Sequence, residues 1–201
     1  MKRFKIGLTV LVVMLASTFS VQANTLKYAF RIDANSLDPY ALAETFTLAF
    51  QGLFYEPLIG RGKTLEVVPA LATEWKPISE DTWRFKLRPN VKFHDGSPFT
   101  ADDVIFSLER AKKEGSDVEY VVADIAAINK IDDLTIDIVT KGPYPILPQR
   151  LTTWYIMSKT WAEENGAVDP SSVKLEVRNF ATTNANGTGP FMIKSRQQDV
   201  S

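Results

Sequence analysis

The sequence WRFKLRPNVKFHDGSPFTADDVIFSLERAKK (residues 83–113) predicts a strand, a turn and a capped helix in succession. Its first six residues alternate large apolar side chains with cations, the period of two that is typical of a strand with one buried and one solvated face. We therefore expect Trp83, Phe85 and Leu87 to point into the core. Residues 91–93 resume the alternation and predict a further short strand.

A turn and then a helix are expected after this strand. Asp95-Gly96 predicts the turn, because glycine adopts positive φ without steric cost. Thr100 stands three residues before Asp103, the spacing of a capping box, so its hydroxyl should cap the helix while Asp102 and Asp103 lie in a solvated, electropositive first turn. Apolar residues then recur at helical spacing, and charged residues occupy the other side. That charged side consists of Glu109, Arg110, Lys112 and Lys113, with Glu109 and Lys113 spaced to form an i, i+4 ion pair.

No residue of this stretch, or of the rest of the chain, forms a recognisable catalytic or metal-binding motif. His94 is the single histidine, and its place beside a turn favours a locally bonded turn residue over a ligand or catalytic group. Asp102 and Asp103 suit a solvated helical turn better than a general acid–base pair. The absence of cysteine excludes disulfides, thiolate metal sites and cysteine nucleophiles. We therefore predict no catalytic residue, no metal site and no cofactor.

The composition is that of a soluble globular protein, 45% hydrophobic and 23% charged over 201 residues. Three cations precede an uncharged apolar run, and Val21-Gln22-Ala23 has the small-x-small pattern of a signal-peptidase site, so residues 1–23 are predicted to be a cleaved signal peptide. A membrane anchor is the rival interpretation, but polar residues dilute the second half of the run. Removing three of the 23 Lys and Arg leaves 20 against 24 Asp and Glu, near −4, which argues against nucleic acid as a partner.

The remaining sequence predicts a mixed α+β chain. Residues 26–30 and 134–138 read as strands, and an apolar approach leads into a short strand that ends at a buried Trp75. Helices are expected at residues 43–53, 149–155 and 160–165. Residues 35–39 form a turn cluster, and residues 186–190 form a turn that leads into a strand at residues 191–193. Gly187 and Gly189 do not fit a phosphate-binding loop.

Five separated motifs together resemble a known family. They are SLDP at residues 36–39, GLFYEPL at 52–58, PALATEW at 69–75, FKLR to FTADDV at 85–104, and GTGPF at 187–191. Their order is similar to that of the family 5 extracellular solute-binding proteins of ABC importers, the oligopeptide- and dipeptide-binding type. The resemblance covers essentially the whole chain after residue 23.

The resemblance implies the N-terminal part of a two-lobed periplasmic binding fold. Members are usually more than twice this long, so residues 24–60 and 180–201 would be parts of lobe I, residues 61–179 most of a small adjoining domain, and the opposite lobe would be absent. By the same resemblance, Ala43, Glu44, Thr45 and Phe46 are expected to face the ligand. N-capping and core packing are the alternative explanation of these four residues.

The implied activity is reversible capture of a peptide or similar small solute in the periplasm and its delivery to an ABC permease in the inner membrane, with no catalysis. A full-length member is expected to be a monomer. Two other classes stay open at this point: a truncated, non-binding fragment or interaction module, and an exported hydrolase.

Overall fold

The structure, a computed structural model, describes residue 27 and residues 29–197. It divides at Arg31 into two units, and the elements described below belong to the second, which begins at Ile32. The predicted signal peptide and its cleavage site lie outside the described residues. The strand predicted at residues 26–30 is described only in part, and Lys27, Ala29 and Phe30 have no strand structure.

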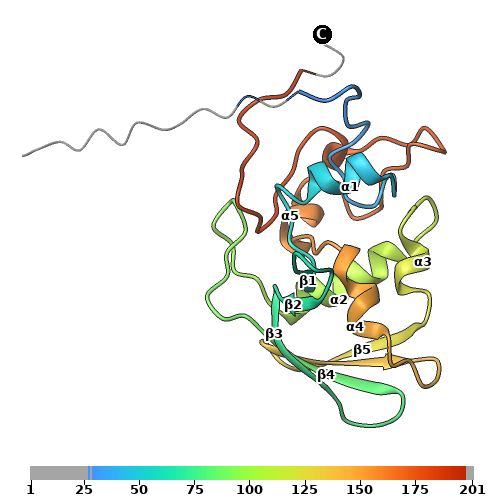
Figure 1. The fold of residues 1–201 in the computed structure, drawn as a ribbon. Helices are drawn as coiled ribbons and strands as arrows, with labels where there is room; N and C mark the ends of the chain where they lie inside the picture. Colours follow the sequence, from blue (N-terminus) through green and yellow to red (C-terminus); the bar gives the residue numbers. More distant parts are fainter. Residues whose placement is uncertain (1–26, 28, 198–201) are drawn as a thin grey trace, which may run out of the picture. The chain divides into compact units, whose positions relative to one another are not determined.

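A four-stranded antiparallel sheet organises the second unit (Figure 1). Its order is β3-β4-β6-β5, with bounds Ala72–Pro77, Thr82–Leu87, Thr135–Thr140 and Ile125–Asp132. The predicted alternation of β4 is confirmed at Phe85 and Leu87, which are buried, and Phe85 lies opposite Ile136. Trp83 is only half-buried, because it lies near the end of the β3–β4 hairpin. The predicted strand at residues 134–138 is confirmed as β6, which returns to this sheet beside β4.

A smaller two-stranded sheet joins β1 (Ile59–Arg61) to β2 (Val67–Pro69). The strand predicted to end at Trp75 is β3, but it continues to Pro77, and Trp75 is half-buried rather than buried. Trp75 pairs with Phe85 across the β3–β4 ladder. The reason for its partial exposure is that β3 is the edge strand of the larger sheet.

The described helices are short apart from one. They are α1 (Thr45–Gln51), α2 (Ala101–Ala111), α3 (Glu119–Val122), α4 (Leu147–Arg150), α5 (Lys159–Glu164) and the 3-10 turns η1 (Leu151–Thr153) and η2 (Phe180–Thr182). The predicted helices at residues 43–53, 149–155 and 160–165 are confirmed with shifted bounds. No helix among the described residues is both long enough and apolar enough to cross a membrane.

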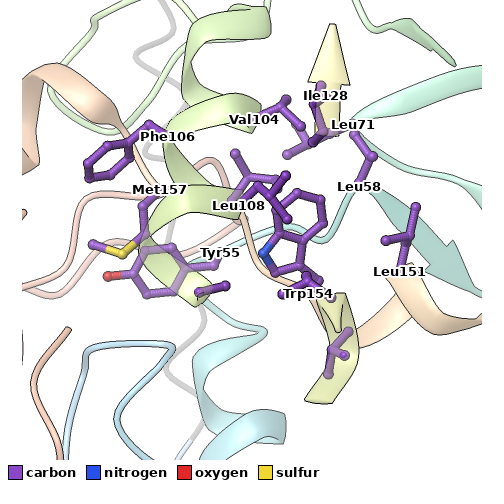
Figure 2. Packing of buried hydrophobic residues seen from close by; sticks show 14 of the residues in the cluster. Tyr55, Leu58, Leu71, Val104, Phe106, Leu108, Ile128, Leu151, Trp154 and Met157 are labelled. Carbon is purple, nitrogen blue, oxygen red and sulfur yellow. The ribbon is translucent and has the colours of Figure 1, made fainter. Parts of the chain in front are cut away.

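Helix α2 lies at the centre of the packing, in contact with β5, α3 and α5. Figure 2 shows Val104, Phe106 and Leu108 of α2 among buried side chains from distant parts of the chain. These neighbours include Tyr55, Leu58, Leu71, Ile128, Leu151, Trp154 and Met157. One continuous cluster of buried apolar residues runs from Leu37 to Ala181, and burial of such side chains is the main stabilising term. It includes residues from both of the domains predicted by resemblance.

Two predicted strands are not formed. Residues 91–93 make a single isolated bridge, between Lys92 and Pro98, because the chain turns back at once through Gly96, whose φ is +88°. The turn itself is confirmed. Residues 191–193 have no strand structure; Phe191 donates its backbone hydrogen bond to Leu53 in the loop after α1 instead.

Candidate functional site

The turn before α1 is built around a buried carboxylate. Asp38 is fully buried, and its side chain accepts hydrogen bonds from the backbone of Tyr40 (3.0 Å) and Ser171 (2.7 Å). Arg110 of α2 donates to both Asp38 oxygens, at 2.7 and 2.6 Å. Burial acts to raise the pKa of Asp38, but the charge and hydrogen bonds of Arg110 outweigh it and lower the pKa. The Asp38 carboxylate of the SLDP turn therefore forms a buried, bidentate ion pair with Arg110.

Arg110 belongs to the charged side predicted for α2, but it is not exposed there. Its side chain is fully buried, and its remaining donors bond the carbonyls of Ala167 and Asp169, both at 3.0 Å. The guanidinium also lies 5.0 Å from the centre of the Tyr40 ring. A charge is tolerated here because the guanidinium is paired with the Asp38 carboxylate and also donates to two backbone carbonyls. The sequence signal we overlooked is Phe106, an apolar residue on the supposedly polar side, which indicates that α2 is buried over a wide arc.

The chain between this turn and α1 is held from outside. The backbone of Asp117 donates to the Tyr40 carbonyl (2.8 Å), and that of Val173 donates to the Ala41 carbonyl (3.2 Å). The Ala43 amide donates to the Asp117 carboxylate at 2.9 Å. Residues far apart in sequence therefore fix the path of the segment that leads to the predicted ligand contacts.

The four residues predicted to face a ligand lie together at the start of α1. Ala43, Glu44 and Phe46 are half-buried and Thr45 is exposed. Glu44 is the residue before the helix, and its carboxylate accepts a hydrogen bond from the Thr47 hydroxyl at 2.9 Å. The segment is thus accessible to a solute while its backbone is fixed.

The apolar side chains of α1 are only partly buried. The residues of α1 that are fully buried are Thr47 and Gln51, and the Gln51 amide donates to the Asp38 carbonyl at 2.8 Å. Phe46 and Phe50 stack with ring centres 6.0 Å apart, and Phe50 meets the buried Phe54 edge-on at 5.1 Å. Together with Leu53, which is 39% exposed, they leave a partly open aromatic surface beside the candidate site.

His94 is hydrogen-bonded to the backbone of the GTG motif at residues 187–189. The Nε2 atom of His94 lies 2.8 Å from the Gly189 carbonyl oxygen, and the His94 backbone amide donates to the Gly187 carbonyl at 2.9 Å. The prediction that His94 bonds locally was wrong, because its partners Gly187 and Gly189 are 93 and 95 positions away. A Cβ on Gly187 would lie 2.1 Å from the Phe54 carbonyl oxygen, so both glycines serve close packing of two backbones.

A separate hollow lies between α5, η2 and the C-terminal segment. Its volume is about 630 Å³, and its lining includes Trp161, Asn165, Phe180, Asn184, Lys194 and Arg196. Trp161 and Phe180 have ring centres 5.6 Å apart. None of the four predicted ligand contacts lines this hollow. Among the described residues, no group of three or more His, Asp or Glu side chains is arranged to hold a metal ion.

The comparisons with known proteins agree on one family. The family described as bacterial extracellular solute-binding proteins, family 5 Middle, matches residues 66–201. The dipeptide-binding protein of Escherichia coli K12 is 30% identical over 97% of this chain. The match extends over 39% of that relative, so the chain spans well under half of its length.

Solved structures give the same fold. The periplasmic binding protein DppA of Helicobacter pylori, in complex with the peptide STSA, superposes with a TM-score of 0.68 and 27% identity over 84% of this chain and 36% of its own. The murein tripeptide binding protein MppA of E. coli has a TM-score of 0.71 over 85% of this chain and 35% of its own; at 23% identity it supports the fold alone. The chain therefore belongs to the family 5 bacterial extracellular solute-binding proteins and has the mixed α/β fold of their N-terminal part.

Proposed function

We propose that this chain is part of a periplasmic solute-binding protein that captures a peptide or similar small solute and passes it to an ABC permease in the inner membrane. The observation that carries the proposal is the family match over residues 66–201. Its relatives include a dipeptide-binding protein and a binding protein in complex with the peptide STSA, which favours a peptide as solute. The action is binding without catalysis.

The geometry of the candidate site supports this proposal. Ala43 to Phe46 are accessible, and the backbone leading to them is held by Asp38 and Asp117. A segment fixed before the ligand arrives loses little conformational entropy on binding, which favours affinity. The partly open rings of Phe46 and Phe50 add apolar surface that a peptide side chain can cover.

The proposal includes the division of the chain between two parts of a two-lobed protein. Residues 24–60 and 180–201 belong to lobe I, residues 61–179 to the adjoining domain, and the solute is enclosed against a second lobe that lies outside this chain. Residues 1–23 direct export to the periplasm and are removed. A two-lobed protein encloses most of its ligand, so one lobe alone leaves a solute half in water.

Isothermal titration with a defined dipeptide pool tests the proposal on two proteins. The first is the 201-residue chain, which we expect to bind no tighter than about millimolar, a free energy of roughly −4 kcal/mol. The second is a chimera in which this chain replaces the matching part of the E. coli dipeptide-binding protein, and there we expect micromolar binding. A folded chimera that binds no dipeptide would contradict the proposal, and release of free amino acids from the pool would favour a hydrolase.

Two variants of the chimera locate the site. Phe46→Ala removes a ring at the candidate site and should weaken binding, whereas Leu65→Ala removes a 71% exposed side chain elsewhere and should not. Equal affinities for these two variants would place the solute away from Ala43–Phe46.

A further inference from the structure

We infer that Asp117 is a positioning residue for the segment Ala43–Phe46, setting where the first turn of α1 presents itself to a solute. The inference rests on the proposed function. It gives a role to the loop between α2 and α3, where no sequence motif indicates one. Asp117 is not itself a contact for the solute. It acts through the backbone of the segment that precedes α1.

Asp117 bonds both ends of a short stretch of chain. Its backbone amide donates to the Tyr40 carbonyl at 2.8 Å, and its carboxylate accepts from the Ala43 amide at 2.9 Å. Between these two bonds, the Ala41 carbonyl is held by the backbone of Val173. Three successive constraints on residues 40 to 43 leave the chain little freedom before α1 begins.

The carboxylate is well suited to this role. The Asp117 side chain is 17% exposed, and its second oxygen is held by the Lys174 ammonium. Burial acts to raise the pKa of Asp117, but the hydrogen bonds from Lys174 and Ala43 lower it, so the group stays charged. A charged acceptor makes a stronger hydrogen bond to a backbone amide than a neutral one does.

Helix α1 needs such an external anchor more than α2 does. Glu44, the residue that precedes α1, makes no side-chain capping bond to the helix backbone, whereas Thr100 and Asp103 form a complete capping box on α2. α1 also has only seven residues, too few to be stable by itself. The Ala43 amide bond to Asp117 therefore anchors the start of α1 where a local cap is lacking.

Amide hydrogen exchange on the 201-residue chain tests the anchor directly. In Asp117→Ala, the Ala43 amide and the Leu48 amide in α1 should exchange about five- to tenfold faster, the effect of losing roughly one hydrogen bond. Amides of the central strand β6 should keep their parental rates. Asp117→Asn retains an oxygen acceptor and should keep most of the protection of the Ala43 amide. This variant can still be measured if Asp117→Ala fails to fold.

The matched control is Asp169→Ala, which removes an exposed carboxylate paired with Lys113 and touches no residue of the segment. It should leave exchange at Ala43 unchanged. Unchanged exchange at Ala43 in Asp117→Ala, or equal acceleration of every amide in the folded protein, would overturn the inference.

Titration of the chimera with the dipeptide pool gives the functional readout. Asp117→Ala should weaken binding about fivefold or more, Asp117→Asn should recover most of the affinity, and Asp169→Ala should match the parent. A parent chimera that binds nothing would count against the proposed function, while the exchange measurement would still decide whether Asp117 holds the segment. Fast exchange at Ala43 together with unchanged affinity would overturn the role in positioning the site.

Discussion

The two ends of helix α2 are fixed by interactions of different range. At the N-terminus, the Thr100 hydroxyl accepts from the Asp102 amide and the Asp103 carboxylate accepts from the Thr100 amide, all within four residues. Near the C-terminus, Arg110 reaches Asp38, 72 positions away, in a pair with no exposed side-chain surface. A local bond is visible in the sequence as a spacing, whereas a distant one is created by the fold. Here the distant bond is also the buried one, and burial makes it costly to break.

The largest effect we predict is for Arg110→Ala. The change leaves the Asp38 carboxylate buried with no cation, and breaking such a pair costs about 3–5 kcal/mol of the free energy of unfolding. Urea denaturation followed by tryptophan fluorescence measures the loss. The double variant Asp38→Leu with Arg110→Met removes both charges and should cost less than the two single variants added together. If Arg110→Ala lowered the free energy of unfolding by less than about 1 kcal/mol, the buried Arg110–Asp38 pair would contribute no more than an exposed surface ion pair.

Lowering the pH should change the stability contributions of Asp38 and Asp103, at the two ends of α2, in opposite directions. The pKa of Asp38 is lowered in the folded state, so its contribution to stability is present above its unfolded pKa of about 3.9 and is lost as the pH falls through the folded pKa. Burial raises the pKa of Asp103, although the amides of Lys159 and Thr100 oppose the shift. The folded state therefore binds the Asp103 proton more tightly, and the contribution of Asp103 decreases as the pH rises from about 3.9 through its raised pKa.

Urea unfolding between pH 3 and pH 6 separates these contributions. The difference in stability between the parent and Asp103→Asn should fall as the pH rises across this range, while the parent itself should lose stability steeply toward the acid end because of Asp38. A difference that stays constant with pH would show that Asp103 has the same affinity for its proton in the folded and unfolded chains.

Sequence patterns predicted the elements whose causes are local. The capping box at Thr100, the turn at Gly96 and the buried face of β4 follow from spacings of two to four residues, and all three are confirmed. Asp103 was correctly assigned to the cap, but the solvated first turn expected for it was wrong: it is 5% exposed, since its second oxygen accepts from the Lys159 amide. That bond depends on how α5 packs on α2, which no local pattern encodes.

The candidate site was harder to predict for the same reason. Ala43 to Phe46 were placed only by family resemblance, and their role stays a prediction. Asp117 bonds Ala43 and Val173 bonds Ala41 just before it, and both partners are more than 70 positions away and are unremarkable in sequence. The strand expected at residues 191–193 is not formed, because a short apolar run after a turn does not provide a partner strand, and Phe191 bonds the Leu53 carbonyl instead.

A smaller effect is expected at the local end of α2. Thr100→Ala removes the hydroxyl that caps the helix, and loss of such a cap costs roughly 0.5–2 kcal/mol. Thermal melting followed by circular dichroism is sufficient to detect it. Thr100→Ser keeps the hydroxyl and serves as the control, so it should melt with the parent. If the alanine variant did so as well, the start of α2 would be held by Asp103 and its packing alone.

The smallest effect should come from Lys113, which tests whether range alone makes a charge pair important. Lys113 lies one turn beyond Arg110 and also bonds a distant residue, Asp169, rather than the predicted Glu109. Its side chain is 38% exposed and that of Asp169 is 82% exposed, so water already solvates both charges. Lys113→Ala should therefore cost no more than about 1 kcal/mol, and less at high salt, although its partner is almost as far away in sequence as that of Arg110. If Lys113→Ala lost as much stability as Arg110→Ala, sequence separation rather than burial would determine the cost of breaking an ion pair. We expect the folding equilibrium constants of the two variants to differ tenfold or more, which would assign that cost to burial.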